Sequence, residues 1–230
     1  MAAPQPTITG SAPKARGKFF YLFLAQVLLV VLFPYLTKPG IPIFLFRFLA
    51  AAAFLSAVYA VSEKRLQWIT ALALAIPAAV LNSVFTFQPH FNLGVASLIF
   101  TILFLAYTLV TLLRAVLRAE TVTLDTIYGA ISVYLLMAMV WGTGYMLLQT
   151  LQPGALAVDT ARHPNHPIDW FDCMFYSFVT LTSLGYGDMV PVTAHGRSLS
   201  ILEAVSGIMY VAVLVARLVG LYAAPKSGKT

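Results

Sequence analysis

Four long runs without a charged side chain constrain this chain more than any other feature of its sequence. They cover residues 19–37, 66–89, 91–113 and 126–158. A helix that crosses a bilayer needs about 20 such residues. Only 10% of the 230 residues are charged and 60% are hydrophobic, whereas a soluble domain carries about 25% charged residues. The sequence therefore predicts an all-α integral membrane protein.

Prolines, glycines and charged residues divide the chain into six expected spans. These cover residues 19–36, 41–61, 66–87, 92–113, 127–150 and 198–221. Basic residues before the first span are also typical of a secretory signal. However, the run from Phe19 to Leu36 is longer than a signal core, and no small-x-small cleavage site follows it. A retained first helix is the better interpretation. Polar Gln26 in this span and Asn82 in the third span are available for hydrogen bonds between helices.

The distribution of basic residues predicts the orientation of the spans. With a cytoplasmic N-terminus, nine Lys and Arg residues fall inside: Lys14, Arg16, Lys18, Lys64, Arg65, Arg114, Arg118, Lys226 and Lys229. Three fall outside: Lys38, Arg162 and Arg197. Positive charge in short loops favours the cytoplasmic side. We therefore expect a multi-pass protein of the cell (cytoplasmic) membrane with both termini cytoplasmic. The net charge of +6 follows from these flanking residues, and no nucleic-acid partner is expected.

The connection between the last two spans contains an apolar segment too short to cross a membrane. This segment runs from Trp170 to Leu181 and leads into a turn with glycine at positions 185 and 187. Non-helical backbone at membrane depth is tolerated only where it is buried in protein or lines a watery path. Glycine reaches backbone angles that other residues reach only with strain. The pattern predicts a re-entrant loop whose carbonyls point to one side, and four copies would form stacked rings of oxygens.

At these residues the chain resembles the potassium channel superfamily, in particular prokaryotic channels with six transmembrane helices, one pore loop and no charged voltage sensor. The resemblance covers residues 127–222. It implies a selectivity filter formed by Thr182, Ser183, Leu184, Gly185, Tyr186, Gly187 and Asp188. By the same resemblance, the carbonyls of Ser183, Leu184, Gly185 and Tyr186 hold K⁺ as the transported ligand, with the Ser183 hydroxyl at the innermost site.

The resemblance also assigns residues around the filter. Gly207 stands at the expected inner-helix hinge, and Ile208, Val211 and Ala212 are expected to line or border the cavity below. Phe175, Tyr176 and Glu203 are expected to support the filter. Because a lone carboxylate in a membrane span is costly and usually functional or paired, we expect Glu203 to lie behind the filter, hydrogen-bonded to the pore helix.

Three positions depart from the family pattern. Ser183 and Leu184 replace the usual threonine and valine; the hydroxyl and the backbone carbonyl are kept, but leucine is bulkier. Phe175 replaces a tryptophan that bonds the aspartate after the filter in many relatives. Phenylalanine has no donor, so Asp188 must find another partner.

The expected spans and the resemblance together predict the domain boundaries of the chain. Residues 1–18 are expected as a cytoplasmic segment, 19–113 as a four-helix voltage-sensor-like or collar domain, and 114–126 as a cytoplasmic linker helix. Residues 127–222 are the expected pore domain, with outer helix, pore helix, filter and inner helix, and 223–230 the cytoplasmic tail. Residues 91–113 carry no arginine, which predicts weak or no voltage dependence because each gating charge supplies only about 2.3 kcal/mol per 100 mV.

One filter per chain predicts a homotetramer in lipid, with a four-fold pore. The function predicted is passive, potassium-selective conduction, without enzymatic activity and without a cofactor. A non-selective cation channel with a loosened filter remains an alternative, and a potassium-uptake transporter subunit is another, although no internal repeat supports it. All four histidines, His90, His163, His166 and His195, are expected on the outer side, where proton sensing or metal binding are further alternatives.

Overall fold

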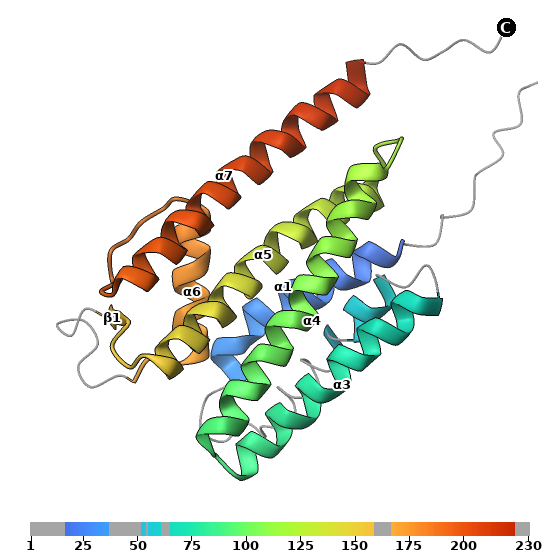
Figure 1. The fold of residues 1–230 in the computed structure, drawn as a ribbon. Helices are drawn as coiled ribbons and strands as arrows, with labels where there is room; N and C mark the ends of the chain where they lie inside the picture. The colour runs from blue at the N-terminus through green and yellow to red at the C-terminus, as the bar shows by residue number, and fades with distance from the viewer. Residues whose placement is uncertain (1–16, 37–51, 54, 61–64, 159–166, 224–230) are drawn as a thin grey trace, which may run out of the picture.

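The computed structural model describes residues 17–36, 52–53, 55–60, 65–158 and 167–223. The fold is helical apart from one small sheet (Figure 1). Its elements, in chain order, are α1 (Lys18–Leu36), α3 (Arg65–Phe87), α4 (Phe91–Arg118), α5 (Leu124–Leu151), β1 (Leu156–Val158), α6 (Trp170–Leu181), β2 (Met189–Pro191) and α7 (Ala194–Ala223).

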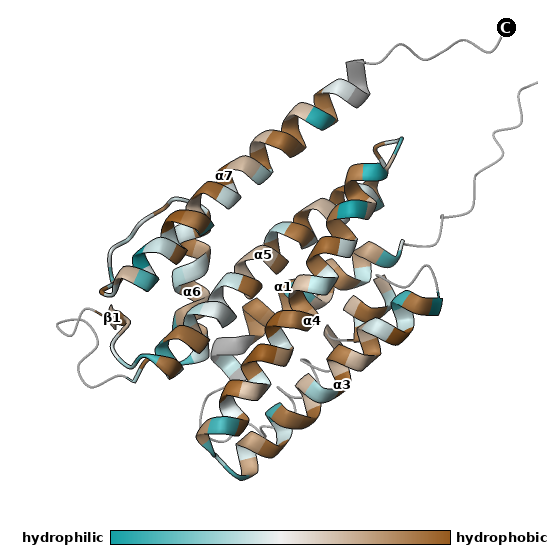
Figure 2. Cartoon of the chain, in the orientation of Figure 1, coloured by the Kyte–Doolittle hydropathy of each residue, from teal (hydrophilic) through white to brown (hydrophobic). Residues whose placement is uncertain are grey.

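Four helices within the described residues are long and apolar enough to cross a membrane: α3, α4, α5 and α7. Helix α1 is a further apolar helix, shorter over its described side chains, Lys18–Leu32. Hydrophobic residues predominate along these helices in the view of Figure 2, as expected for helices that cross a membrane. The second expected span, 41–61, lies mostly outside the described residues. The described part of this span, residues 52–53 and 55–60, is helical. The chain is thus an all-α membrane protein with at least four candidate spans.

The stretch 114–126 differs from the expected linker helix. Its first part, to Arg118, continues α4, because Leu112 and Val116 keep the buried stripe of that helix in register. Residues 119–123 then form a short connection. Helix α5 begins after Thr123, whose hydroxyl accepts a hydrogen bond from the amide of Thr126 (3.2 Å), a typical N-cap. This short connection places α4 and α5 antiparallel and side by side.

The main hydrophobic core joins α1, α4 and α5. It includes Leu22 from α1, Phe104 and Leu112 from α4, and Val133 and Leu136 from α5. Gln26 of α1 donates to the Ser132 carbonyl of α5 (3.4 Å), which confirms its expected bond between helices. Asn82 is instead exposed on α3.

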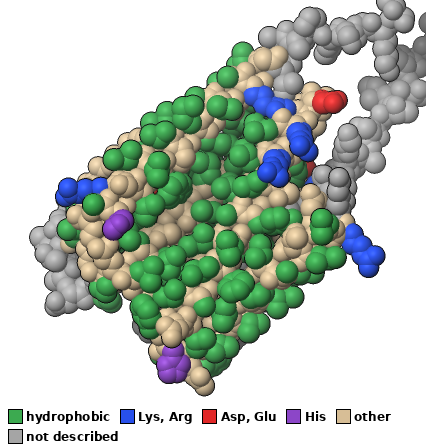
Figure 3. Space-filling view, in the orientation of Figure 1, with side chains coloured by type: hydrophobic (Ala, Val, Ile, Leu, Met, Phe, Trp, Pro, Cys, Tyr) green, Lys and Arg blue, Asp and Glu red, His purple; other side chains and the backbone are tan. Residues whose placement is uncertain are grey.

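Basic side chains gather at one end of the helix bundle (Figure 3). This is the end at which α1 and α3 begin and α4 and α7 end (Figure 1). Asp125, at the start of α5, accepts hydrogen bonds there from the amides of Phe19 and Phe20, both 3.2 Å, and so satisfies free donors in the first turn of α1. Arg217 of α7 donates to the Ala119 carbonyl after α4 (2.5 Å). Hydrogen bonds at this end therefore join α1 to α5, and α7 to the connection between α4 and α5.

Candidate functional site

The short helix α6 begins with a complete capping box. The Asp169 side chain accepts from the amide of Asp172 (2.9 Å), and the Asp172 side chain accepts from the amide of Asp169 (2.8 Å). The helix has 12 residues and is therefore about 18 Å long, well short of a bilayer core of about 30 Å. Its inner face is buried against α5 and α7.

Helix α6 ends in a Schellman motif that uses serine in place of the usual glycine. The amide of Leu184 donates to the Val179 carbonyl (2.9 Å), and the amide of Ser183 donates to the Thr180 carbonyl (3.0 Å). The motif requires a left-handed residue after the cap, and Ser183 has φ +57°. A non-glycine residue adopts this conformation at a cost of about 1–2 kcal/mol. The helix end thus directs the chain into the glycine-rich segment.

Left-handed backbone then recurs at every second residue. Ser183, Gly185 and Gly187 have φ +57°, +61° and +75°, and Leu184 and Tyr186 between them do not have positive φ. Where left-handed residues alternate with residues of negative φ, successive carbonyls can point to the same side of the chain. The segment 183–187, called the carbonyl row below, therefore has the alternating backbone that suits carbonyls on one side.

This carbonyl row is exposed in the single chain. Leu184 is 57% and Tyr186 62% exposed. Within the described part of the chain, the backbone of residues 185–188 makes no hydrogen bond to other backbone groups. Backbone polar groups inside a membrane must nevertheless be satisfied. The row therefore requires water, ions or other copies of the chain as partners.

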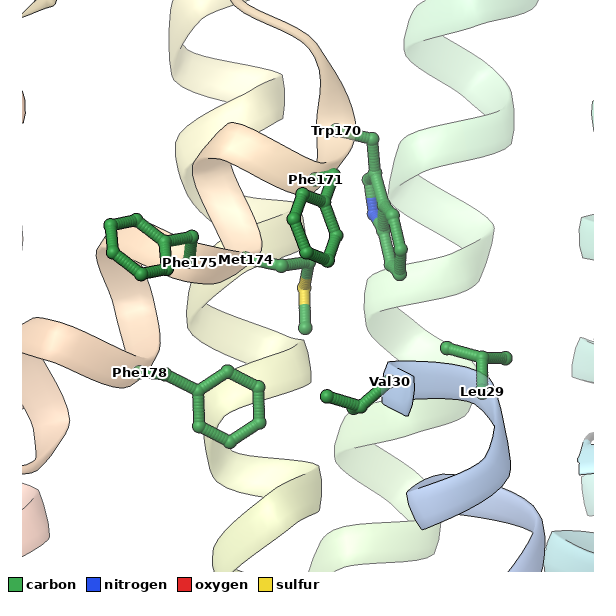
Figure 4. Close-up of a pocket in the computed structure, with 7 residues that line it drawn as sticks. All are labelled: Leu29, Val30, Trp170, Phe171, Met174, Phe175 and Phe178. Carbon is green, nitrogen blue, oxygen red and sulfur yellow. The ribbon is translucent and has the colours of Figure 1, made fainter. Parts of the chain in front are cut away.

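One aromatic side chain of the carbonyl row packs against helix α6. Tyr186 stacks on Phe175 of α6, with ring centroids 6.2 Å apart and planes 7° apart. Phe175 also lines a cavity of about 180 Å³ between α6 and α1. Figure 4 shows its lining side chains, all apolar: Leu29, Val30, Trp170, Phe171, Met174, Phe175 and Phe178. The N-terminal helix α1 thus lies close to the helix that leads into the carbonyl row.

Glu203 of α7 is fully buried behind α6. Its carboxyl group accepts a hydrogen bond from the Tyr145 hydroxyl of α5 (2.6 Å) and contacts the Ser177 hydroxyl of α6. The Ser177 hydroxyl also lies 2.8 Å from the Ala138 carbonyl of α5. The contact with α6 that the sequence analysis expected for Glu203 is present, and the same group joins all three helices of this region.

A second set of hydroxyls extends this network toward β2. Ser200 of α7 lies 2.7 Å from the Tyr176 hydroxyl and 3.4 Å from the Tyr145 hydroxyl. The rings of Tyr145 and Tyr176 pack edge to face, 4.9 Å apart. Tyr176 is therefore held on the buried side of α6.

Gly207 permits a close approach between α7 and the end of α6. A Cβ atom at this position would collide with the Leu181 carbonyl, which also accepts from the Tyr134 hydroxyl of α5 (3.2 Å). Helix α7 continues through Gly207 without a break. Contact thus accounts for glycine here, and a hinge role stays a prediction. The other expected cavity residues, Ile208, Val211 and Ala212, lie on exposed faces of α7.

Sequence reasoning missed several contacts around the site. Tyr145 and Ser177 carry a usable signal, because polar groups within apolar helices usually have partners. Strands β1 and β2 have three residues each, too few to recognise from alternation. Arg217 bonds a backbone carbonyl, which leaves no mark in the sequence.

Histidines and acidic residues do not assemble into a metal site within the described part of the chain. His90 is the residue before α4, without a capping side-chain hydrogen bond, and His195 lies in the first turn of α7. Both lie at the end of the bundle opposite the gathered basic side chains. His163 and His166 lie outside the described residues, as does any metal site they would form.

Comparison with known proteins gives a family match for the C-terminal part of the chain. Residues 121–223 match a family model described as an ion channel. The matched segment contains α5, α6, the carbonyl row and α7. No curated protein and no solved structure matches the chain. The match supports an ion channel domain in a membrane protein, and with it passive ion conduction.

Proposed function

We propose that this protein is a potassium-selective channel. The observation that carries the proposal is the regular alternation of left-handed backbone at Ser183, Gly185 and Gly187 at the end of a short helix within an ion channel domain. Carbonyl oxygens in such a row can replace the hydration shell of K⁺. The residues of the proposed filter are Thr182, Ser183, Leu184, Gly185, Tyr186, Gly187 and Asp188.

Coordination of K⁺ falls to the backbone rather than to side chains. The carbonyls of Ser183, Leu184, Gly185 and Tyr186 form the ion sites, and the Ser183 hydroxyl completes the innermost one. Helix α6 acts as the pore helix, and its C-terminal end carries partial negative charge that favours a cation. No cofactor takes part.

The working unit is a homotetramer around a four-fold axis. One row of carbonyls per chain cannot surround an ion, so four chains must contribute. The exposed carbonyl row and the exposed apolar side chains of α7 support this assembly, among them Ile201, Leu202, Val205, Ile208 and Met209. Ile208, Val211 and Ala212 would border the cavity below the filter in the tetramer.

Orientation follows from the charges at the two ends. The bundle end that contains Lys18, Arg65, Arg114, Arg118 and Arg217 is the cytoplasmic end by the positive-inside rule. Both termini are then cytoplasmic in the cell membrane, and the carbonyl row opens toward the outside. Residues 19–113 form a sensor-like domain or a packing collar, and residues 127–222 the pore domain.

Potassium flux from liposomes tests the filter assignment. The change Gly185→Ala places a Cβ on a residue with φ +61° inside the carbonyl row, and we expect it to abolish K⁺ flux. The change Gly154→Ala imposes comparable strain at φ +84°, in open space outside the row. This control is expected to conduct normally.

Equal flux through both variants would contradict the filter assignment. If both variants lose K⁺ flux equally, backbone strain alone explains the loss. Flux of K⁺ and Na⁺ at similar rates through the wild-type protein would favour the alternative, a non-selective cation channel loosened at Ser183 and Leu184.

A further inference from the structure

Different structural elements hold the two ends of the carbonyl row. Its N-terminal end is fixed by the Schellman motif of α6. Its C-terminal end, Asp188, leads directly into β2, which pairs with β1 in an antiparallel two-stranded sheet. Strand β1 belongs to the segment that follows α5, so this sheet connects the end of the row to a distant part of the chain.

The register of the sheet identifies the pair that carries the hydrogen bonds. Leu156 faces Pro191, Ala157 faces Val190 and Val158 faces Met189. The Val192 amide donates to the Ala155 carbonyl (2.9 Å). Because hydrogen-bonded pairs alternate along an antiparallel ladder, the next such pair is Ala157 with Val190. Pro191, which has no N–H, falls in a pair that needs none.

The two faces of the sheet have different surroundings. Leu156 and Met189 are buried with Cys173 and Tyr176 of α6 and with Tyr145 of α5. Val190 is 46% exposed on the opposite face. The sheet is therefore packed onto the helix that precedes the carbonyl row, and it is not a free surface hairpin.

Contacts with the start of α7 fix the far end of β2. Arg197 donates to the Pro191 carbonyl (3.4 Å). A Cβ atom on Gly196 would lie 3.2 Å from Pro191 and 3.3 Å from the Ala155 carbonyl. The strand is thus enclosed between β1 and α7.

Asp188 has little other restraint from the described residues. None of the described residues forms a hydrogen bond to its carboxylate, and Phe175 offers only a ring face to neighbouring Tyr186. On the basis of the proposed channel function, we propose that the β1–β2 sheet anchors the outer end of the filter. Ala157 and Val190 are its positioning residues, because their backbone bonds hold Asp188 in place through β2.

Single proline substitutions in the full-length channel test this anchor. Ala157→Pro removes the N–H that pairs with Val190, and Val190→Pro removes the reciprocal N–H. Val158→Pro is the matched control, because the N–H of Val158 points away from β2 in this register. K⁺ currents of each variant and of the wild type are recorded in planar bilayers, together with the K⁺ to Na⁺ permeability ratio.

We expect Ala157→Pro and Val190→Pro to speed the decay of K⁺ current by about five- to tenfold, as the loss of one hydrogen bond allows. Val158→Pro should decay like the wild type. Higher outer K⁺ should slow the decay in the two sensitive variants, because ions that bind only the intact filter stabilise it. A general loss of packing would not respond to K⁺ in this way.

Three results would overturn the anchor: wild-type decay in assembled Ala157→Pro and Val190→Pro channels, equal decay in all three variants, or failure of every proline variant to assemble. Selective K⁺ current through the wild type would sustain the proposed function in each of these cases. Loss of that selectivity in the wild type would instead refute the proposed function, independently of the sheet.

Discussion

At the scale of single residues, Ser183 occupies a position with two separate structural requirements. It occupies the left-handed position that closes α6, where glycine would cost less, and it is the first residue of the carbonyl row. Glycine at this position would relieve strain but would remove the hydroxyl proposed for the innermost ion site. The presence of serine is consistent with a functional demand on that hydroxyl, in line with the general tendency for backbone strain to occur at functional sites.

Glu203 offers a direct test of the buried network. In Glu203→Gln, the amide can donate to Ser177 while its oxygen still accepts from Tyr145, and Ser177 can donate to Ala138. We expect K⁺ flux to be kept and the free energy of unfolding to change by less than about 1 kcal/mol. Glu203→Leu has the same approximate size but no polar atom, and should destabilise the protein by about 2 kcal/mol. Thermal unfolding in detergent measures both, and equal stability of the two variants would contradict a structural role for the network.

Some of this site was predictable from single residues, and some was not. The unusual cost of a carboxylate in a span led to the expected contact between Glu203 and the short helix. Polarity within an apolar span nominated both Gln26 and Asn82 for bonds between helices. Gln26 makes such a bond, whereas Asn82 is exposed, because the sequence does not tell which helix face meets a neighbour. The partners of Glu203 were not predictable, since Tyr145 and Ser177 come together only when three helices pack.

At the scale of helices, the approach of α7 to α6 depends on Gly207. In Gly207→Ala, the added Cβ would collide with the Leu181 carbonyl, so α7 must move away from α6. We expect a loss of about 1–3 kcal/mol in stability, as for other overpacked sites. Gly220→Ala in the same helix is the control, because nothing lies within 4 Å of its added Cβ.

The control variant should be neutral or more stable by up to about 1 kcal/mol, from helix propensity alone. Thermal unfolding of the two purified variants measures the difference. Equal stability of Gly207→Ala and Gly220→Ala would show that the close contact is not essential. The hinge predicted from the sequence would then be the remaining explanation for glycine at position 207.

Helix bounds were predictable where apolar runs end in charges or turn residues. The bounds of α3 and α6 lie within one residue of the expected segments. Helix α4 is longer than expected because its buried stripe continues past Arg114. Strands β1 and β2 were not expected, because their pairing depends on two loops that meet only in the folded chain.

At the scale of the whole molecule, the absence of charge along α4 limits any response to voltage. Its only arginines, Arg114 and Arg118, lie in its last two turns at the basic end of the bundle. Steep gating needs several charges that cross the field, each worth about 2.3 kcal/mol per 100 mV. We expect a nearly flat conductance–voltage relation in symmetric K⁺. A steep sigmoidal relation would contradict this prediction.

The carbonyl row of residues 183–187 is proposed to select potassium in an assembly of four chains. The reversal potential of the purified protein tests it most directly, in a planar bilayer with K⁺ on one side and Na⁺ on the other. We expect a reversal close to the potassium equilibrium potential. A clear current that reverses near zero would contradict it, and would mean that the filter passes both ions.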